Sequence, residues 1–190
     1  MLLFGHIGIT AGVARACDII ISAAEPGGSR LIPWLGRVKN RIGQVDYRLV
    51  LLGSLLPDII DKPVFLLVGG VSLSGRDYAH SLLFSLVLLI AGLVLILYGK
   101  SRLLTVSLSA LTHLIFDQIY NNPVTLFWPL LGPLSGGEVA SWLPGVVFGL
   151  FNYPGAYIPE ITGLLIVLLF AYRLVKRKGV TSFIREGVIT

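Results

Sequence analysis

The sequence predicts an all-α integral membrane protein, a polytopic helical bundle formed by a single domain of 190 residues. Hydrophobic residues make up 55% of the chain and charged residues 13%, a composition that soluble domains do not have. Apolar runs such as 81–98 and 161–175 approach the length needed to cross a hydrocarbon layer of about 30 Å. Helices are the expected spanning elements because they satisfy their backbone hydrogen bonds internally.

Five apolar segments are predicted to span the membrane, with boundaries defined to within several residues. They cover residues 2–24, 49–70, 79–98, 103–120 and 156–175. The first segment could instead be a cleaved signal peptide. It has no basic region before its apolar run, however, and His6 interrupts that run, so we expect a retained span.

Lysine and arginine are distributed unevenly between the connections. They gather in the first connection, the third connection and the C-terminal end, as Arg30, Arg37, Lys39, Arg41, Arg48, Lys100, Arg102, Arg173, Lys176, Arg177, Lys178 and Arg185. The second connection has only Arg76, and the fourth, residues 121–155, has none. Because basic connections stay on the cytoplasmic side, this pattern predicts a multi-pass plasma-membrane protein with its N-terminus outside and a cytoplasmic tail at 176–190.

Two connections contain segments that we expect to lie at the membrane surface. Residues 30–48 alternate apolar and basic side chains at roughly helical spacing, which is typical of a helix on an anionic surface. Residues 126–131 and 142–151 are rich in aromatic residues, proline and glycine, but they are too short to span easily. We expect these two segments to be re-entrant or to lie flat on the outer surface.

Six ionisable residues are predicted to meet at one depth near the extracytoplasmic surface, namely His6, Asp58, Asp61, His80, His113 and Asp117. A charged aspartate at the centre of a span costs roughly 2.5–3.5 kcal/mol, so such residues require an explanation. The spacings of three and four residues within the pairs Asp58/Asp61 and His113/Asp117 place each pair on one helix face. A mixture of imidazoles and carboxylates suits zinc, manganese or iron better than calcium. The single cysteine, Cys17, excludes an all-thiolate structural site.

Each of these residues also has a structural interpretation when it is taken alone. His113 could be a packing histidine, and Asp58 could pair with Lys62 four residues later. The convergence of all three histidines at one depth favours a shared site over these separate roles. Arg76, four residues before His80, is placed to contact an anionic substrate oxygen, although it could simply be solvated.

Other polar and small residues carry weaker expectations. Gly8 and Gly12 are expected to allow close helix packing. Arg15 and Asp18 are expected to pair with each other or with a lipid head group. Glu160 enters the last span from the outside and is a further candidate ligand.

Several segments resemble, in order, the motifs of the membrane-bound metal-dependent hydrolase family that includes the YdjM-like proteins. The resemblance covers roughly residues 1–131 and rests on residues 5–6, 53–58, 76–83, 113–117 and 126–129. It implies that the metal ligands are His6, Asp58, His80, His113 and Asp117. The order of these ligands is also similar to that of zinc-dependent phospholipase C. Two histidines usual in the family are replaced here, where the chain reads Asp61-Lys62 and Gly75-Arg76.

The predicted function is a metal-dependent hydrolase that acts on a phosphate ester, with a phospholipid or lipid phosphate as the expected substrate. The expected cofactor is a divalent metal, zinc or alternatively manganese, with Asp61 as catalytic base and Arg76 as phosphate contact. Membrane lipids are the expected partners. Nucleic acid is not expected, because the basic residues lie beside the spans and do not form one basic face. A metal-ion or proton transporter and a catalytically degenerate scaffold are the alternatives.

Overall fold

The computed structural model describes residues 2–23, 43–68, 73–134, 136 and 139–189. These residues form helices and turns, with no strand among them, which confirms the predicted all-α class. The elements are α1 (Leu3–Ala23), α3 (Tyr47–Val68), α4 (Leu82–Leu97), α5 (Arg102–Phe116), the 3₁₀ helix η1 (Ile119–Asn121), α6 (Pro123–Leu126), α7 (Val139–Asn152), α8 (Pro154–Lys176) and α9 (Val180–Glu186). Most of the surface helix predicted for residues 30–48 lies outside the described residues.

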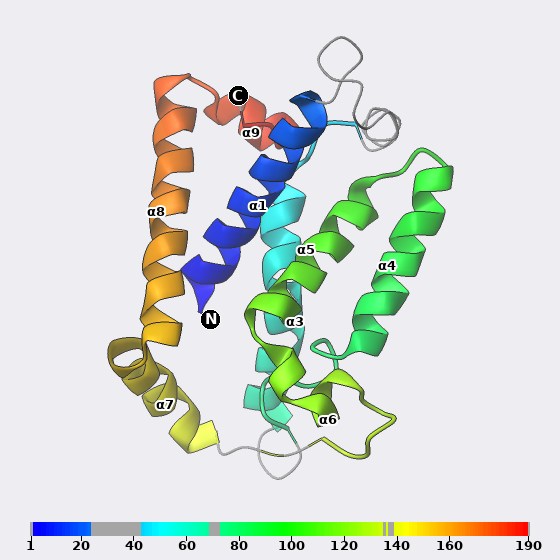
Figure 1. Cartoon of the computed structure of the whole chain (residues 1–190), viewed down its shortest axis with the longest axis vertical. Coiled ribbons are helices and arrows are strands. Elements are labelled where there is room, and N and C mark those ends of the chain that lie inside the picture. Colours follow the sequence, from blue (N-terminus) through cyan, green and yellow to red (C-terminus); the bar gives the residue numbers. More distant parts are fainter. Residues whose placement is uncertain (1, 24–42, 69–72, 135, 137–138, 190) are drawn as a thin grey trace.

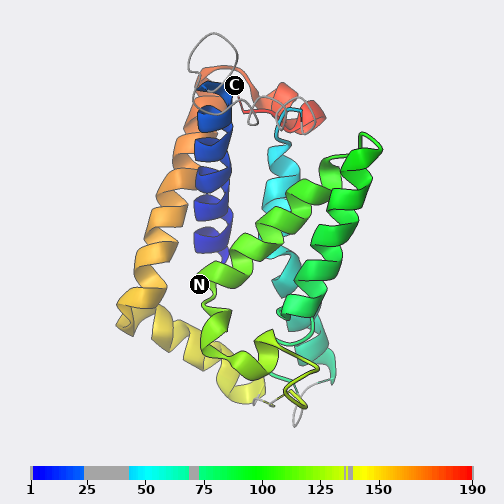
Figure 2. The same cartoon turned by 45° about the vertical axis from the view of Figure 1, so that its right-hand side comes forward.

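Five long helices form the bundle, and each coincides with one predicted apolar segment. They are α1, α3, α4, α5 and α8, and consecutive members run in opposite directions (Figure 1). The helix pairs α1–α8 and α4–α5 flank α3, which packs against both α1 and α5 (Figure 2). The short helices α6 and α7 lie at the same end of the bundle, opposite α9, with α7 below α8 and α6 below α5 (Figure 1).

Two of these helices are long and apolar enough to cross a membrane, Leu3–Ser22 within α1 and Pro154–Lys176, which is α8. The apolar sequence of α3 is interrupted by Asp58, Asp61 and Lys62. The helices α4 and α5 have only 16 and 15 residues, about 24 and 22 Å of helix. The number of spans therefore stays a prediction.

The bundle has a polar interior and an apolar exterior. The side chains of His6, His80 and His113 are completely buried. Large aliphatic side chains are exposed instead, including Leu67 at 86% and Val175 at 69%. Such an arrangement is expected when the surrounding solvent is lipid, because apolar surface of this extent would be unfavourable in water.

Glycines permit the closest helix contacts and so fix where the helices cross. A Cβ atom added at Gly8 of α1 would overlap the carbonyl group of Gly163 of α8. A Cβ atom added at Gly53 of α3 would lie 2.5 Å from the carbonyl oxygen of Val106 of α5. The predicted packing role of Gly8 is confirmed, and the second crossing brings the backbone of α3 next to His113.

The C-terminal segment returns to the bundle and binds the start of α3. Arg48 donates hydrogen bonds to the carbonyl oxygens of Ile184 and Arg185, and the N–H of Tyr47 donates to the carbonyl oxygen of Gly187. Asp46 holds the Arg48 guanidinium at 2.7 Å, and this hydrogen bond lowers the pKa of the Asp46 carboxyl below its usual range. The predicted tail therefore contains a docked helix, α9.

Candidate metal centre

His80 is fixed in place by a buried carboxylate of α3. Asp61 accepts a hydrogen bond from Nδ1 of His80 at 2.7 Å, and three more from the backbone N–H groups of Asp77, Ala79 and His80 at 2.8–3.2 Å. These amides lie in the turn before α4, where they have no helical partner. Because a carboxylate accepts but cannot donate, Nδ1 of His80 carries the proton, and in the neutral ring Nε2 presents a lone pair.

His113 is oriented by backbone. Its Nδ1 lies 2.7 Å from the carbonyl oxygen of Ser54, which accepts a hydrogen bond from it. The carbonyl reaches the ring because Gly53 allows α3 and α5 to approach closely. The proton of His113 is therefore also on Nδ1, and its Nε2 likewise presents a lone pair.

The two Nε2 atoms of His80 and His113 face each other at 3.2 Å inside the bundle. With both Nδ1 protons donated elsewhere, neither neutral ring has a hydrogen for this contact. Two buried acceptors at such a distance repel one another unless a cation or a proton lies between them. A ring nitrogen that binds metal while the other donates to a carboxylate or carbonyl is the usual arrangement of histidine ligands.

Asp58 completes this group from α3. Its Oδ1 atom lies 3.6 Å from Nε2 of His80 and 3.8 Å from Nε2 of His113. Its Oδ2 atom lies 2.5 Å from Nζ of Lys62, so the predicted i, i+4 pair does form. Asp58 can therefore be both a candidate metal ligand, through Oδ1, and the partner of Lys62, through Oδ2.

Asp117, the residue directly after α5, joins the centre from another side. Its Oδ2 atom lies 3.9 Å from Nε2 of His80 and 2.6 Å from Nε of Arg76. Its Oδ1 atom lies 3.1 Å from Nε2 of His6. The carboxylate therefore links His6, His80 and the arginine, and its side chain is only 2% exposed.

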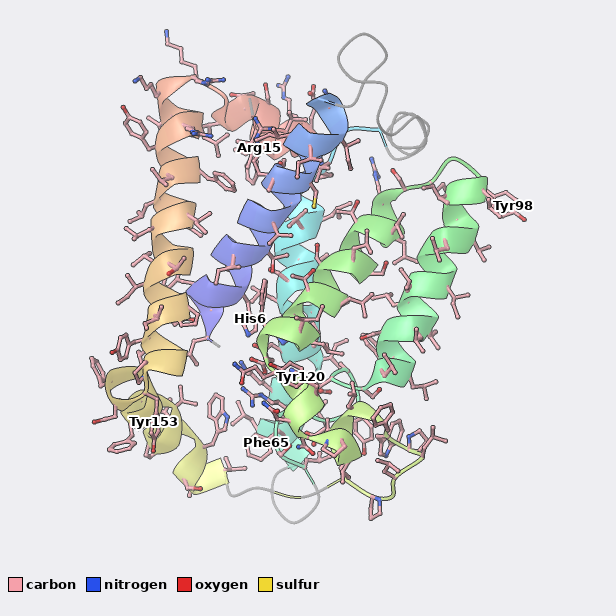
Figure 3. All side chains as sticks on the ribbon, viewed as in Figure 1. His6, Arg15, Phe65, Tyr98, Tyr120 and Tyr153 are labelled. Atoms are coloured by element: carbon pink, nitrogen blue, oxygen red, sulfur yellow. The ribbon has the colours of Figure 1, made fainter. Side chains whose placement is uncertain are left out.

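His6 lies in the first turn of α1, just below mid-height in the view of Figure 3. Its ring stacks on that of His113, with centroids 3.9 Å apart and planes inclined by 18°. Its Nδ1 atom is buried and has no hydrogen-bond partner among the described residues. The structure thus brings all three histidines of the chain together, as the sequence predicts.

The spacing of these atoms can be compared with that of a metal site. Ligands of a tetrahedral zinc ion, each about 2.0–2.1 Å from the metal, lie about 3.4 Å from one another. The separations that link His80, His113, Asp58 and Asp117 are 3.2, 3.6, 3.8 and 3.9 Å. Candidate ligand atoms of His80, His113 and Asp117 all lie within 4.8 Å of one another, and so do those of His6, Asp58 and His113. These buried groups could hold a metal ion.

The two residues predicted to be catalytic occupy different positions. Asp61 lies behind His80, with its oxygens engaged by the ring and the backbone amides, and not between the ligand atoms. These contacts are those of a residue that orients the His80 ring. They do not support the expected role of Asp61 as a catalytic base. Arg76 contacts Asp117 through Nε, and its side chain is 49% exposed.

Glu160 does not join the centre. Its carboxylate accepts hydrogen bonds from the N–H groups of Leu2, Phe4 and Gly5 and so caps the beginning of α1. Asp77, which sequence reasoning did not single out, accepts from the N–H groups of Ser74 and Gly75 and shapes the turn before His80. The position of Asp77 three residues before His80 was the sequence signal that could have indicated this role.

A cavity of about 360 Å³ adjoins the centre. Arg76 and Asp117 contribute its charged side chains. The corner between α7 and α8 supplies another part of its lining, where Gly145, Gly149 and Gly155 lie among Val146, Tyr153 and Ala156. The centre is therefore accessible to a small molecule next to Arg76.

Comparison with known protein families matches residues 1–180 to the family described as YdjM inner membrane protein. No curated protein sequence and no solved structure matches the chain. The family match covers nearly the whole chain and agrees with the polar interior and apolar exterior of the bundle, so the protein is a membrane protein. The chain belongs to the YdjM inner membrane protein family.

Proposed function

We propose that this chain is a membrane-embedded, metal-dependent hydrolase of phosphate esters. The observation that supports it best is the pair of Nε2 atoms of His80 and His113, 3.2 Å apart with both Nδ1 protons engaged elsewhere. This contact is unfavourable between neutral rings and becomes favourable around a cation. The cavity beside Arg76 gives a substrate a place next to that cation.

The residues that would hold the ion are His80, His113, Asp58 and Asp117, with His6 as a fifth. Two or three imidazoles with two carboxylates favour zinc, with manganese as the second choice. A bound divalent ion of this kind makes water a stronger nucleophile at neutral pH and stabilises negative charge on a phosphoryl group. The Nε2 atom of His6 also contacts Asp117 at 3.1 Å, so His6 would interact with the ion indirectly through that carboxylate.

The surrounding side chains have positioning and binding roles in this proposal. Asp61 orients His80, and the carbonyl of Ser54 orients His113. Arg76 lies at the cavity and would bind a non-bridging phosphate oxygen. In the reaction, the oxygen of water bonds to phosphorus, the ester P–O bond breaks, and the alcohol leaves with a proton derived from that water.

We also propose that the five long helices all cross the membrane, with the N-terminus and the metal centre toward the extracytoplasmic side. The basic residues of the α4–α5 turn and of the end of α8 lie at one end of the bundle in Figure 1, and the turn that carries Arg76 lies toward the other. Basic residues stay on the cytoplasmic side. Labelling of cysteines introduced at Lys100 and Ser74 from outside the cell tests this orientation; labelling at Lys100 alone would contradict it.

Transport of metal ions or protons is a second candidate. A second cavity, of about 460 Å³, lies between α1 and α5, and its lining includes Thr10 and Ser109, one helical turn from His6 and His113. Most of its other lining residues are aliphatic, such as Val13 and Leu108, which opposes the passage of ions. Metal-dependent uptake into proteoliposomes, without hydrolysis, would favour this candidate over the hydrolase.

Hydrolysis of 4-nitrophenyl phosphate by the purified protein, with zinc or manganese added, tests the proposal. We expect metal-dependent turnover that His113→Ala and Asp117→Ala abolish together with metal binding. Asp18→Asn is the matched control, because that carboxylate pairs with Arg15 at 3.0 Å outside the centre. Thermal unfolding of each variant separates loss of the site from loss of the fold. Hydrolysis that survives both alanine variants, or that needs no metal, would contradict the proposal.

A further inference from the structure

We infer that the cavity beside Arg76 binds the phosphate ester group of a membrane lipid, whose hydrocarbon part extends along α7 into the bilayer. This inference rests on the proposed function and names its substrate class. It is carried by three features of the cavity, which are a cationic side, a glycine wall and an apolar rim.

The cationic side is Arg76. Its Nε donates to Asp117 at 2.6 Å, and the guanidinium as a whole presents five N–H donors in a planar fork that matches phosphate oxygens. Its side chain is half exposed, although it borders a buried centre. A ligand that reaches this arginine therefore also reaches the edge of the metal centre at Asp117.

The glycine wall belongs to α7 and the start of α8. A Cβ atom added at Gly145 or Gly155 would meet no atom within 4 Å, so these positions border open space. The Cβ of Gly149 would make only an ordinary contact, 3.6 Å from the Tyr153 ring. Helix packing does not require glycine at Gly145 or Gly155, unlike at Gly8 in α1. Glycine at these two positions leaves room for a ligand beside the side chains of Val146 and Tyr153, which also line the cavity.

The apolar rim is the outer surface of α7. None of its described side chains is buried, and Val147, Phe148 and Phe151 are 48%, 57% and 76% exposed. The α7–α8 corner, marked by Tyr153 in Figure 3, lies on the outside of the bundle. The ring of Phe148 contacts that of Tyr153, with centroids 5.9 Å apart, and Tyr153 lines the cavity. In a membrane the surface of α7 would face lipid, and at Tyr153 it adjoins the cavity, so a ligand could enter from the bilayer at this point.

The size of the cavity agrees with a lipid whose head group alone is enclosed. Its 360 Å³ is at the lower end of the roughly 300–1,000 Å³ typical of ligand sites. That volume holds a phosphate together with a glycerol, but not two acyl chains. The chains would have to lie outside it, and the apolar surface of α7 is the adjoining surface that can receive them.

The test compares lipid and soluble esters in wild type and Gly145→Leu. A leucine at this position would extend into the α7 side of the cavity, because Gly145 lines it and nothing lies within 4 Å of an added Cβ. Ala171→Leu, at an exposed position nearer the other end of α8, is the matched control. Phosphatidic acid in mixed micelles and 4-nitrophenyl phosphate are the two substrates.

A binding measurement complements turnover. Metal-free protein in nanodiscs would be irradiated with a non-hydrolysable phosphonate analogue of phosphatidic acid that carries a diazirine on its acyl chain. Mass spectrometry then locates the crosslinks. We expect crosslinks on α7, and Gly145→Leu should reduce both this labelling and phosphatidic acid turnover by about tenfold or more. Ala171→Leu should leave both unchanged, whereas Gly145→Leu should lower turnover of the soluble ester less than it lowers turnover of phosphatidic acid.

The outcomes separate the two proposals. Metal-dependent hydrolysis of the soluble ester without hydrolysis of phosphatidic acid would overturn the lipid inference and leave the hydrolase intact. Equal crosslinking of wild type and Gly145→Leu would also overturn the lipid inference alone. Absence of metal binding and of hydrolysis of either ester would overturn both.

Discussion

Replacement of Asp61 by asparagine should weaken zinc binding although Asp61 is not expected to touch the metal. The Oδ2 atom of Asp61 accepts from Nδ1 of His80 at 2.7 Å and from the N–H of Asp77, Ala79 and His80. Asparagine keeps the shape and one acceptor oxygen, but it removes the negative charge that polarises the ring. Loss of such an outer carboxylate weakens metal binding by about 10–100-fold. That range corresponds to roughly 1.4–2.7 kcal/mol of binding free energy.

The assay is a competitive zinc titration of metal-stripped protein in detergent, with a fluorescent zinc indicator. Asp18→Asn, which alters a carboxylate outside the centre, should bind zinc within about twofold of wild type. Zinc affinity equal to wild type in Asp61→Asn would refute the orienting role. If that variant also lost hydrolysis while it retained zinc, the result would instead support Asp61 as the base.

Three further predictions concern helix packing, the contacts that hold the C-terminal segment against the start of α3, and the cavity. Gly8→Ala should lower the free energy of unfolding by about 1–3 kcal/mol or more, because the added Cβ overlaps α8. In Gly12→Ala the nearest contact of the added Cβ is a side-chain atom at 3.4 Å, so this variant should be close to neutral in thermal unfolding. The lowered pKa of Asp46 means that its pair with Arg48 stabilises the fold above the ordinary value of 3.8, and that this contribution is lost as the pH falls below it. Asp46→Asn should therefore speed amide exchange in α9 by about threefold at pH 7. Unchanged exchange would show that the Asp46–Arg48 pair does not hold the C-terminal segment in place. Arg76→Gln should lower kcat/KM for a phosphate ester by about 100-fold and change zinc affinity less than threefold. A loss of zinc affinity as large as the loss of activity would contradict a role of Arg76 in substrate binding.

Most of the helical framework could be predicted because lipid constrains the length and composition of each helix. The segment predicted at 2–24 is Leu3–Ala23, and that at 156–175 is Pro154–Lys176. The end of α5 was predicted too late, at residue 120, because Gln118 adopts positive φ and a 3₁₀ turn follows. Periodicity and hydropathy alone do not locate the residue at which the backbone leaves the helical conformation.

Which residues gather at the candidate metal centre was largely predictable from the sequence, whereas the roles of individual residues were not. His6, Asp58, His80, His113 and Asp117 converge as expected, because alternating helix directions bring their ends to one level. Asp61 lies only three residues from Asp58, and spacing does not reveal that its partners are amides of the next turn. Spacing likewise gives no signal for the carbonyl of Ser54, since every residue has one.

The position of Glu160 also depends on tertiary contacts. Its sequence context, at the outer start of an apolar helix, is the same for a metal ligand and for a helix cap. The close crossing of Gly8 and Gly163 brings the carboxylate to the first amides of α1, where it satisfies N–H groups that have no helical partner. Only the geometry of that crossing decides between the two roles.

X-ray absorption at the zinc edge of purified, zinc-loaded protein tests the central claim most directly, because it reports the number and type of atoms around the ion. We expect one zinc per chain, four or five nitrogen and oxygen neighbours at about 2.0–2.2 Å, and scattering from at least two imidazole rings that His80→Ala and His113→Ala each reduce. Zinc bound with no imidazole scattering, or with a spectrum that neither variant changes, would contradict it.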